Sequence, residues 1–266
     1  MIIAKESYLP RRHMKKNMLC SVLLSAIFCI NCGKGSPTAP SEASQVTSSS
    51  EGLLTFSFDD NRLCAFNTAV SVLDKAGYKA TEYVITGKMS GSDDYMSSRD
   101  VLDMQSRGHE IGSHTRTHRD LTTISQSEWQ SEIVGAKDDL HAMGIRNVIT
   151  FAYPFGGVNQ SVESFVRNAG YSGARSTING IVTGSSDPFS LPRQNLGGNV
   201  AISDVKKWMD DAKQNKTWLI LLAHHVDHSP NDYSITPELF SEIVNYAKTS
   251  SLRVVTISEG LRIKGM

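Results

Sequence analysis

The chain has 266 residues, enough for one sizeable domain with a hydrophobic core. Its 27 basic and 27 acidic residues balance, but the first 31 residues carry five basic side chains against one acidic, a local charge of +4, so the remainder stands at −4. A mildly acidic body gains little from electrostatic attraction to polyanions, and we therefore expect no nucleic acid partner.

Residues 1–32 have the pattern of a signal peptide. A basic stretch precedes the apolar run 18–30, which is too short for a comfortable membrane span. The segment resembles a bacterial lipoprotein signal, with Cys32 as the lipidated first residue of the mature chain, although Asn31 replaces the usual small residue and Cys29 is a second candidate. We expect an exported protein, either anchored to the membrane through Cys32 or, after cleavage of a plain signal peptide, secreted.

Residues 33–50 are rich in Ser, Pro and Gly and predict a flexible linker, because such a sequence is too polar to pack. Past this linker the body, residues 51–266, contains a single cysteine, Cys64, which has no partner there for an intrachain disulfide. Cys64 follows the first strand-like segment, so it could be a nucleophile, but a small buried side chain is the more common role of a free cysteine.

The body alternates strand-like and helix-like segments. Apolar, β-prone runs lie at residues 53–58, 81–85, 109–113, 147–152, 218–223 and 252–257. Apolar stripes at helical spacing lie at residues 69–76, 101–105, 129–143, 162–169, 205–212 and 236–247. Repeated βα units predict a parallel sheet, open or closed into a barrel, with active residues at the carboxyl ends of the strands.

The first strand-like run ends in two adjacent carboxylates, Asp59 and Asp60. Neighbouring side chains on a strand point to opposite faces, so one carboxylate could bind a metal while the other handles a proton. The alternative is an ordinary turn after a strand, for which Asp and Asn are favoured residues.

Histidines follow two other strand-like runs. His114 and His118 are four residues apart and would share one face if the segment turned helically, so that both imidazoles could meet one ion. With one carboxylate they would form a set of two histidines and one carboxylate that suits Zn²⁺ and other divalent metals. His224 ends the run 218–223, where an imidazole could give or take a proton near neutral pH, or could be an ordinary loop histidine.

Four motifs in this order resemble the NodB-like polysaccharide deacetylases, carbohydrate esterase family 4. They are the strand end at residues 57–60, the His114 to His118 segment, the Tyr-Pro-Phe-Gly loop at 153–156, and Leu-Ala-His at 222–224. The resemblance covers about residues 52–262. It implies an α/β fold, a distorted (β/α) barrel of about seven parallel strands, in a single catalytic domain over residues 51–266.

The resemblance also implies roles. Asp60, His114 and His118 would bind a divalent metal, Zn²⁺ most readily, with Co²⁺ or Ni²⁺ as alternatives. Asp59 would be the general base, and His224 the general acid that protonates the leaving group.

The backbone N–H of Phe155 would help to hold the oxyanion, and Tyr153 and Leu222 would shape the acetyl pocket.

Three residues and one motif depart from the family pattern: His225 replaces the aspartate that often follows the catalytic histidine, and the usual Asp-Trp motif is not clear, since Asp204 and Trp208 match it poorly. Asn61 stands where glycine is usual and could narrow the opening beside the metal, and Ala152 stands where many members carry an arginine that orients the base. Arg193 could supply that guanidinium from another loop, or could be a surface arginine.

We therefore expect metal-dependent hydrolysis of acetyl groups from an acetylated polysaccharide, in the first place N-deacetylation of N-acetylglucosamine units. One alternative is an O-acetyl esterase acting on xylan. The other, which Ala152 and Asn61 would favour, is a carbohydrate-binding lipoprotein without turnover.

Overall fold

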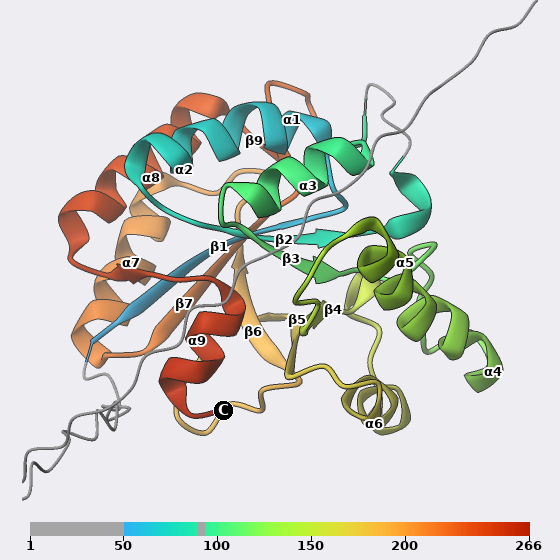
Figure 1. The fold of residues 1–266 in the computed structure, drawn as a ribbon. Coiled ribbons are helices and arrows are strands. Elements are labelled where there is room, and N and C mark those ends of the chain that lie inside the picture. Colours follow the sequence, from blue (N-terminus) through green and yellow to red (C-terminus); the bar gives the residue numbers. More distant parts are fainter. Residues whose placement is uncertain (1–50, 90–93) are drawn as a thin grey trace, which may run out of the picture. The chain divides into compact units, whose positions relative to one another are not determined.

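Seven parallel strands form a closed barrel in the computed structural model, which describes residues 51–89 and 94–266 (Figure 1). The strands are β1 (Leu53–Asp59), β2 (Thr81–Val84), β3 (Glu110–Ser113), β4 (Thr150–Ala152), β5 (Gly173–Asn179), β6 (Leu191–Asn195) and β7 (Trp218–Ala223). They pair in sequence order, and β7 pairs back with β1. The predicted barrel is confirmed, whereas the predicted signal peptide and linker lie outside the described residues.

The barrel is distorted because its strands do not pair evenly. Strands β3 and β4 share a single register pair, Ser113 with Phe151, and the β5–β6 register shifts between Arg175 and Asn179. A short additional strand, β10 (Arg253–Val254), pairs with the start of β1, whose pairing with β2 begins only at Ser57. Strands β5 and β6 were not predicted individually from the sequence.

Helices cover the outside of the barrel. They are α1 (Leu63–Ala65), which continues through a π-helical turn into α2 (Ser71–Ala76), α3 (Ser98–Ser106), α4 (Gln126–Trp129), which continues likewise into α5 (Gly135–Met143), α6 (Gln160–Asn168), α7 (Ile202–Asn215) and α8 (Pro237–Ser250). Side chains alternate along a strand, so Phe56 and Phe58 of β1 face outward and pack on Phe240 of α8, at ring distances of 5.8 and 5.9 Å. None of the described helices is long and apolar enough to cross a membrane.

Helix α9 (Ile257–Lys264) closes the amino-terminal end of the barrel. The backbone N–H of Ile257 donates to Thr81 Oγ1 at the start of β2, at 2.9 Å. Gly260 lies against Trp218 at the start of β7, so closely that a Cβ there would fall 2.3 Å from the indole ring. The prediction of one strand over residues 252–257 was wrong, because only two of these residues pair and the segment then turns into this helix.

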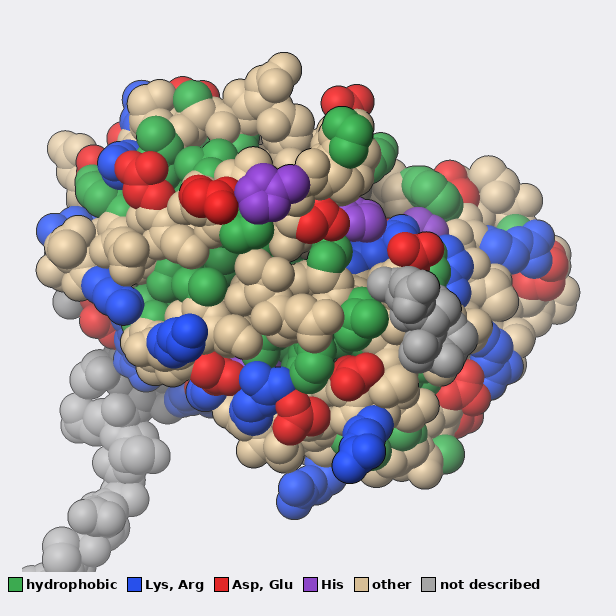
Figure 2. Space-filling view, turned by 90° about the horizontal axis from the view of Figure 1, so that it is seen from above, with side chains coloured by type: hydrophobic (Ala, Val, Ile, Leu, Met, Phe, Trp, Pro, Cys, Tyr) green, Lys and Arg blue, Asp and Glu red, His purple; other side chains and the backbone are tan. Residues whose placement is uncertain are grey.

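Charged side chains of both signs are interspersed over the face of the molecule in Figure 2. With the amino-terminal end sealed by α9, the open end of the barrel is the one where the carboxyl ends of the strands meet.

Candidate active site

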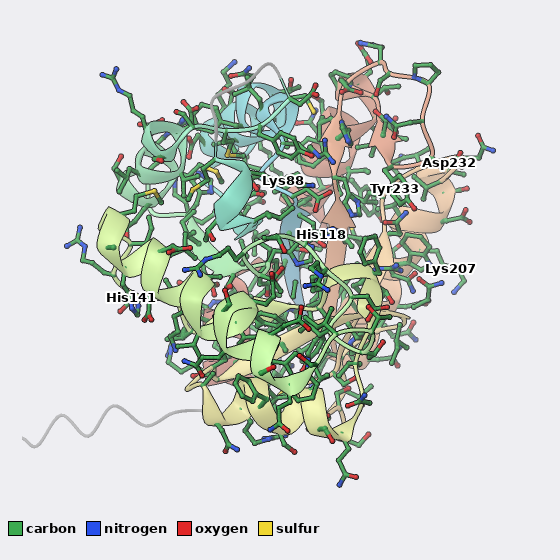
Figure 3. All side chains as sticks on the ribbon, turned by 90° about the vertical axis from the view of Figure 1, so that its right-hand side faces the viewer. Lys88, His118, His141, Lys207, Asp232 and Tyr233 are labelled. Carbon is green, nitrogen blue, oxygen red and sulfur yellow. The ribbon has the colours of Figure 1, made fainter. Side chains whose placement is uncertain are left out.

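A cavity of about 500 Å³ opens at the carboxyl ends of the barrel strands, the side that faces the viewer in Figure 3. Every residue that the sequence singled out for the site lines it: Asp59, Asp60, His114, His118, Tyr153, Phe155, Arg193, Leu222 and His224. These residues come from five strand ends, which the closure of the barrel brings to one rim. Lys88, His118 and Tyr233 lie near the centre of this view, whereas His141 and Lys207 lie toward its margin.

Asp60, His114 and His118 form a compact set of ligand atoms, all within 4.8 Å of one another. Asp60 Oδ1 lies 3.3 Å from His118 Nε2 and 3.6 Å from His114 Nε2. Tetrahedral Zn²⁺ with bonds of about 2.0–2.2 Å to nitrogen and oxygen needs ligand atoms roughly 3.3–3.5 Å apart. Asp60 Oδ1 is also buried and has no hydrogen-bond partner within residues 51–89 and 94–266, so the set fits a divalent cation.

The local backbone aims these imidazoles. His114 Nδ1 lies 2.8 Å from the Ala152 carbonyl oxygen, which can only accept, so Nδ1 holds the proton and Nε2 is free to bind a cation. The segment 114–118 is not helical, contrary to the geometry expected for the pair. Thr115 and His118 have φ of 66° and 62°, and these two left-handed residues bring both rings to one point.

Positive φ angles concentrate at the site. The described non-glycine residues with such angles number seven, and five of them are at the site: Asp60, Asn61, Thr115, His118 and Phe155. Each such conformation costs on the order of 1–3 kcal/mol and is kept only where the surrounding structure enforces it. The backbone therefore gives up stability at this rim to direct side chains.

Asn61 does not narrow the cavity. It is fully buried, its Oδ1 accepts a hydrogen bond from the Ile85 N–H at 3.0 Å, and its own N–H donates to Glu82 Oε1 at 2.9 Å. Its side chain thus ties the end of β1 to the end of β2. Asparagine tolerates the φ of 44° found here better than most other residues do.

An arginine that the sequence did not single out contacts the expected base. Arg175 of β5 is fully buried and its Nη2 donates to Asp59 Oδ2. Arg175 and Ala152 are register partners on adjacent strands, so their side chains point to the same face of the sheet. Arg193, which could have filled this role or been a surface arginine, lines the cavity and donates to Asn179.

Charge and burial set the protonation states of the acidic groups. Burial alone would raise the pKa of Asp59, but the Arg175 guanidinium and then the His114 imidazole hold that pKa below its usual range. Burial acts on Asp60 in the same sense, and there His114 and then His118 lower the pKa below its ordinary value. Both carboxylates are therefore ionised at neutral pH.

Burial lowers the pKa of two imidazoles at the site, His118 and His224. Burial lowers the pKa of His118 to about 4, with the nearby His114 acting in the same direction. Burial also lowers the pKa of His224, against the opposite effect of the Asp59 and Asp60 carboxylates. An ionised Asp60 and a neutral His118 are in the protonation states in which such side chains bind a cation.

Aromatic rings form two walls of the cavity. The exposed Phe155 ring packs edge-on to His118 at 4.6 Å, and the exposed Tyr233 ring packs edge-on to His224 at 5.2 Å. Tyr153 and Leu222 line the cavity as buried side chains, and the Tyr153 hydroxyl has no hydrogen-bond partner among the described residues. Tyr233 was not predicted, because it lies in a loop without a motif.

Comparison with known proteins adds the family context. Residues 47–174 match a family model described as polysaccharide deacetylase. The chain is 26% identical over 178 residues to YxkH of Bacillus subtilis (strain 168), provisionally named a polysaccharide deacetylase, in a match that covers 65% of this chain and 63% of YxkH. It is 27% identical over 164 residues to a peptidoglycan-N-acetylglucosamine deacetylase of Bacillus cereus, covering 62% of this chain and 68% of that protein. The chain thus spans less than two thirds of the length of YxkH.

A solved structure is similar in both fold and sequence. The Streptococcus pyogenes deacetylase PplD in complex with acetate matches with a TM-score of 0.55 and 28% identity, over 57% of this chain and 68% of that chain.

Proposed function

Because this chain belongs to the polysaccharide deacetylase family, with a NodB-like barrel, we propose that it is a hydrolase that removes acetyl groups from a glycan. The observation that carries the proposal is one cavity lined by an ionised carboxylate, Asp59, by an imidazole, His224, and by a set of three side chains that fits a cation. These are the groups that hydrolysis of an amide or ester requires.

Asp60, His114 and His118 would hold the divalent cation, which we propose to be Zn²⁺, with Co²⁺ or Ni²⁺ as alternatives. When bound, such a cation polarises the acetyl carbonyl and lowers the pKa of a water molecule.

Asp59 would act as the general base. Arg175 donates to its Oδ2, whereas its buried Oδ1 has no hydrogen-bond partner in the described part of the chain and can accept the proton of the attacking water. Arg175 would act through Asp59, by orienting the carboxylate and keeping it ionised.

His224 would donate a proton to the leaving nitrogen or oxygen. Burial lowers the pKa of His224, and the Asp59 and Asp60 carboxylates oppose that effect, so these two charges favour the protonated form that a general acid needs. The proton that leaves His224 balances the one that Asp59 accepts, so acetate and a free amine or alcohol are the products.

Phe155 and the buried cavity wall would recognise the acetyl group. A backbone φ of 56° at Phe155, unusual for a bulky residue, sets the direction of the N–H that we propose to face the oxyanion. Tyr153 and Leu222 would enclose the methyl group.

For the substrate we propose N-acetylglucosamine units of an envelope or extracellular polysaccharide. The support is the similarity to a peptidoglycan-N-acetylglucosamine deacetylase. Export agrees with this substrate, and we propose it on the pattern of residues 1–32, as we do a lipid anchor at Cys32. Against loss of turnover we set two observations: Arg175, the register partner of Ala152, contacts Asp59, and the Asn61 side chain is buried between two strands.

The test is acetate release from acetylated chito-oligosaccharides by the full chain with Zn²⁺. We expect His224→Ala to lower amide cleavage by about 10²–10⁴-fold and to lower cleavage of an activated acetyl ester much less, because an amine leaving group needs protonation more than an activated alcohol does. His228→Ala is the matched control, since that histidine is exposed and pairs with Glu238.

Equal losses on amide and ester would contradict the acid role of His224. Release of acetate only from acetylated xylan would replace the proposed substrate by an ester. Glycan binding without acetate release, with Zn²⁺, Co²⁺ and Ni²⁺ each tried, would identify a carbohydrate-binding protein instead.

A further inference from the structure

A second group of metal-ligand side chains lies beside the cavity, apart from the first. It consists of Cys64 on α1, His225 on the two-residue strand β8 (His225–Val226), and Asp227 just after that strand. The ligand atoms Cys64 Sγ, His225 Nδ1 and Asp227 Oδ2 come from two distant parts of the chain and lie within 4.8 Å of one another. The proposed deacetylation has no use for any of the three.

The distances are those of a shared cation. Cys64 Sγ and Asp227 Oδ2 each lie 3.6 Å from the same nitrogen, His225 Nδ1. Tetrahedral Zn²⁺ with bonds of about 2.3 Å to sulfur and about 2.0–2.2 Å to nitrogen and oxygen would need roughly 3.6 and 3.4 Å for these two pairs. Cys64 Sγ lies within sulfur hydrogen-bond range of His225 Nδ1, and Asp227 Oδ2 lies within ion-pair range of the same nitrogen, so the three groups already meet around one point.

The Asp227 carboxylate is oriented by its surroundings. Its other oxygen, Oδ1, accepts hydrogen bonds from the Ser229 N–H and hydroxyl and from the Ser234 hydroxyl. Because these bonds hold Oδ1, the other oxygen, Oδ2, points toward Cys64 and His225. Hydrogen bonds to the far side of a ligand orient the ligands of metal sites in the same way. The side chains of His225 and Asp227 are 23% and 29% exposed, so an ion can enter and water can complete its coordination.

We propose that Cys64, His225 and Asp227 form a second transition-metal site, of a type that suits Zn²⁺ or Co²⁺ through one thiolate, one imidazole and one carboxylate. Such an ion ties α1 to β8. Strand β8 pairs with β9 (Ser234–Ile235), and the loop between them carries Tyr233 to the wall of the cavity beside His224 (Figure 3). The second ion would therefore hold the loop that presents Tyr233.

Binding must displace a proton from sulfur. Burial, and next the neighbouring Asp227, leave the pKa of Cys64 raised to about 11 despite backbone hydrogen bonding, so the thiol is protonated at neutral pH without a metal. Metal coordination converts it to the thiolate, and one proton passes to the buffer for each ion bound at this site.

The test is titration of the metal-free full chain with Co²⁺ alone. We expect two equivalents to bind, with a near-ultraviolet thiolate-to-cobalt absorption band that belongs to one of them. Cys64→Ser should abolish the band and one equivalent, whereas Asp60→Asn should remove the other equivalent and keep the band. The triple variant Cys20→Ser, Cys29→Ser, Cys32→Ser is the control and should retain both.

Binding of a single equivalent without the band would overturn the proposal, as would a band that survives Cys64→Ser. Should Cys64→Ser fail to fold, Asp227→Asn keeps the thiol and removes one ligand charge. Asp227→Asn should then lower the affinity for the second Co²⁺ ion at least tenfold. An unchanged affinity would refute the site. If the unmodified chain binds one equivalent and that equivalent gives the thiolate band, the site at Asp60, His114 and His118 does not bind the metal. That result would count against the proposed deacetylase and leave this inference standing.

Discussion

Replacing Arg175 by methionine removes the guanidinium that contacts the Asp59 carboxylate inside the barrel. Arg175 is fully buried and Asp59 nearly so, and methionine fills much of the same volume without charge. Removing one partner of a buried ion pair leaves an uncompensated charge and costs about 3–5 kcal/mol of unfolding free energy. Burial then raises the pKa of Asp59 without its main opposing charge, so more of this carboxyl is protonated near neutrality.

Two measurements check this expectation. Urea unfolding should show the loss of about 3–5 kcal/mol in Arg175→Met, and recovery of most of it when Asp59→Asn removes the orphaned charge in the same chain. The acid limb of kcat/KM for acetate release should move to higher pH, because a base must be ionised to act. Arg175→Lys keeps the charge and should fall between wild type and Arg175→Met on both scales.

Arg193→Met is the matched control. Arg193 bonds to Asn179, so its loss should cost no more than about 1 kcal/mol and leave the acid limb in place. A swap, Ala152→Arg with Arg175→Ala, returns a guanidinium at the same register level of the adjacent strand and should recover part of the activity. The reasoning is refuted if Arg193→Met moves the acid limb and Arg175→Met does not.

Three further expectations concern stability. Burial, and next the Asp59 charge, raise the pKa of Glu82 well above its ordinary value, so the folded protein keeps a proton that the unfolded chain releases. The free energy of unfolding should therefore fall as pH rises, by up to about 1.4 kcal/mol per pH unit between the unfolded and folded pKa values of Glu82. Urea unfolding at pH values from about 5 to 8 measures this slope. Glu82→Gln should remove it, and the exposed control Glu242→Gln should keep it. Asn61→Ala should lower the free energy of unfolding by about 1–3 kcal/mol, because the buried Ile85 N–H loses its acceptor, and by about 1–2 kcal/mol more, because alanine is strained at positive φ. Asn61→Gly should incur only the first of these losses. A larger loss for glycine than for alanine would contradict this reasoning. Zn²⁺ at 100 times its dissociation constant should stabilise the metal-free protein by about 2.7 kcal/mol per site in chemical unfolding, and an equal gain in Asp60→Asn would remove this residue from the ligand set.

The pattern of apolar residues along the sequence was sufficient to predict the strands that are apolar throughout and the helices whose apolar residues recur every three or four positions. It failed at β5, where only the first four residues are buried and one of them is Arg175, so neither apolar content nor strict alternation marks the strand. It also failed at residues 252–257, because β-branched residues there end a short strand and begin a helix that plugs the barrel. The His114–His118 pair was recognised by its spacing, but positive φ angles rather than a helical turn bring the rings together.

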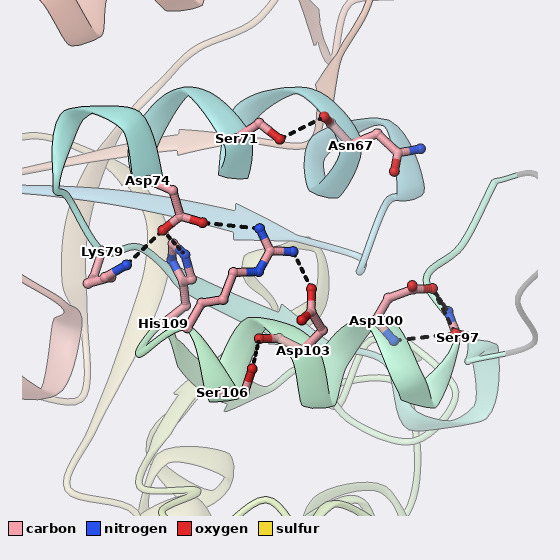
Figure 4. A network of polar contacts seen from close by, with 10 residues as sticks. Asn67, Ser71, Asp74, Lys79, Ser97, Asp100, Asp103, Ser106 and His109 are labelled. Carbon is pink, nitrogen blue, oxygen red and sulfur yellow. Dashed lines mark hydrogen bonds and ion pairs between the residues drawn. The ribbon is translucent and has the colours of Figure 1, made fainter.

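Ion pairs between residues on different elements could not be predicted from the positions of those residues in the sequence. Asp74 of α2 accepts hydrogen bonds from Lys79 at 2.7 Å and Arg107 at 3.0 Å, and His109 Nε2 lies 3.2 Å from it (Figure 4). Nothing in the sequence distinguishes this half-buried carboxylate from the other acidic residues as the one that ties α2 to the end of α3 and the start of β3.

The sequence alone determined the alternation of strands and helices and the residues that end the strands, Asp59, Asp60, His114 and His224 among them. These follow from side-chain periodicity and backbone preference, which act over a few residues. The tertiary structure alone decided that Arg175 faces Asp59 and that Cys64 meets His225 and Asp227. Strand register and barrel closure determine these contacts. Both depend on packing interactions over the whole chain, so no short segment of sequence is enough to predict them.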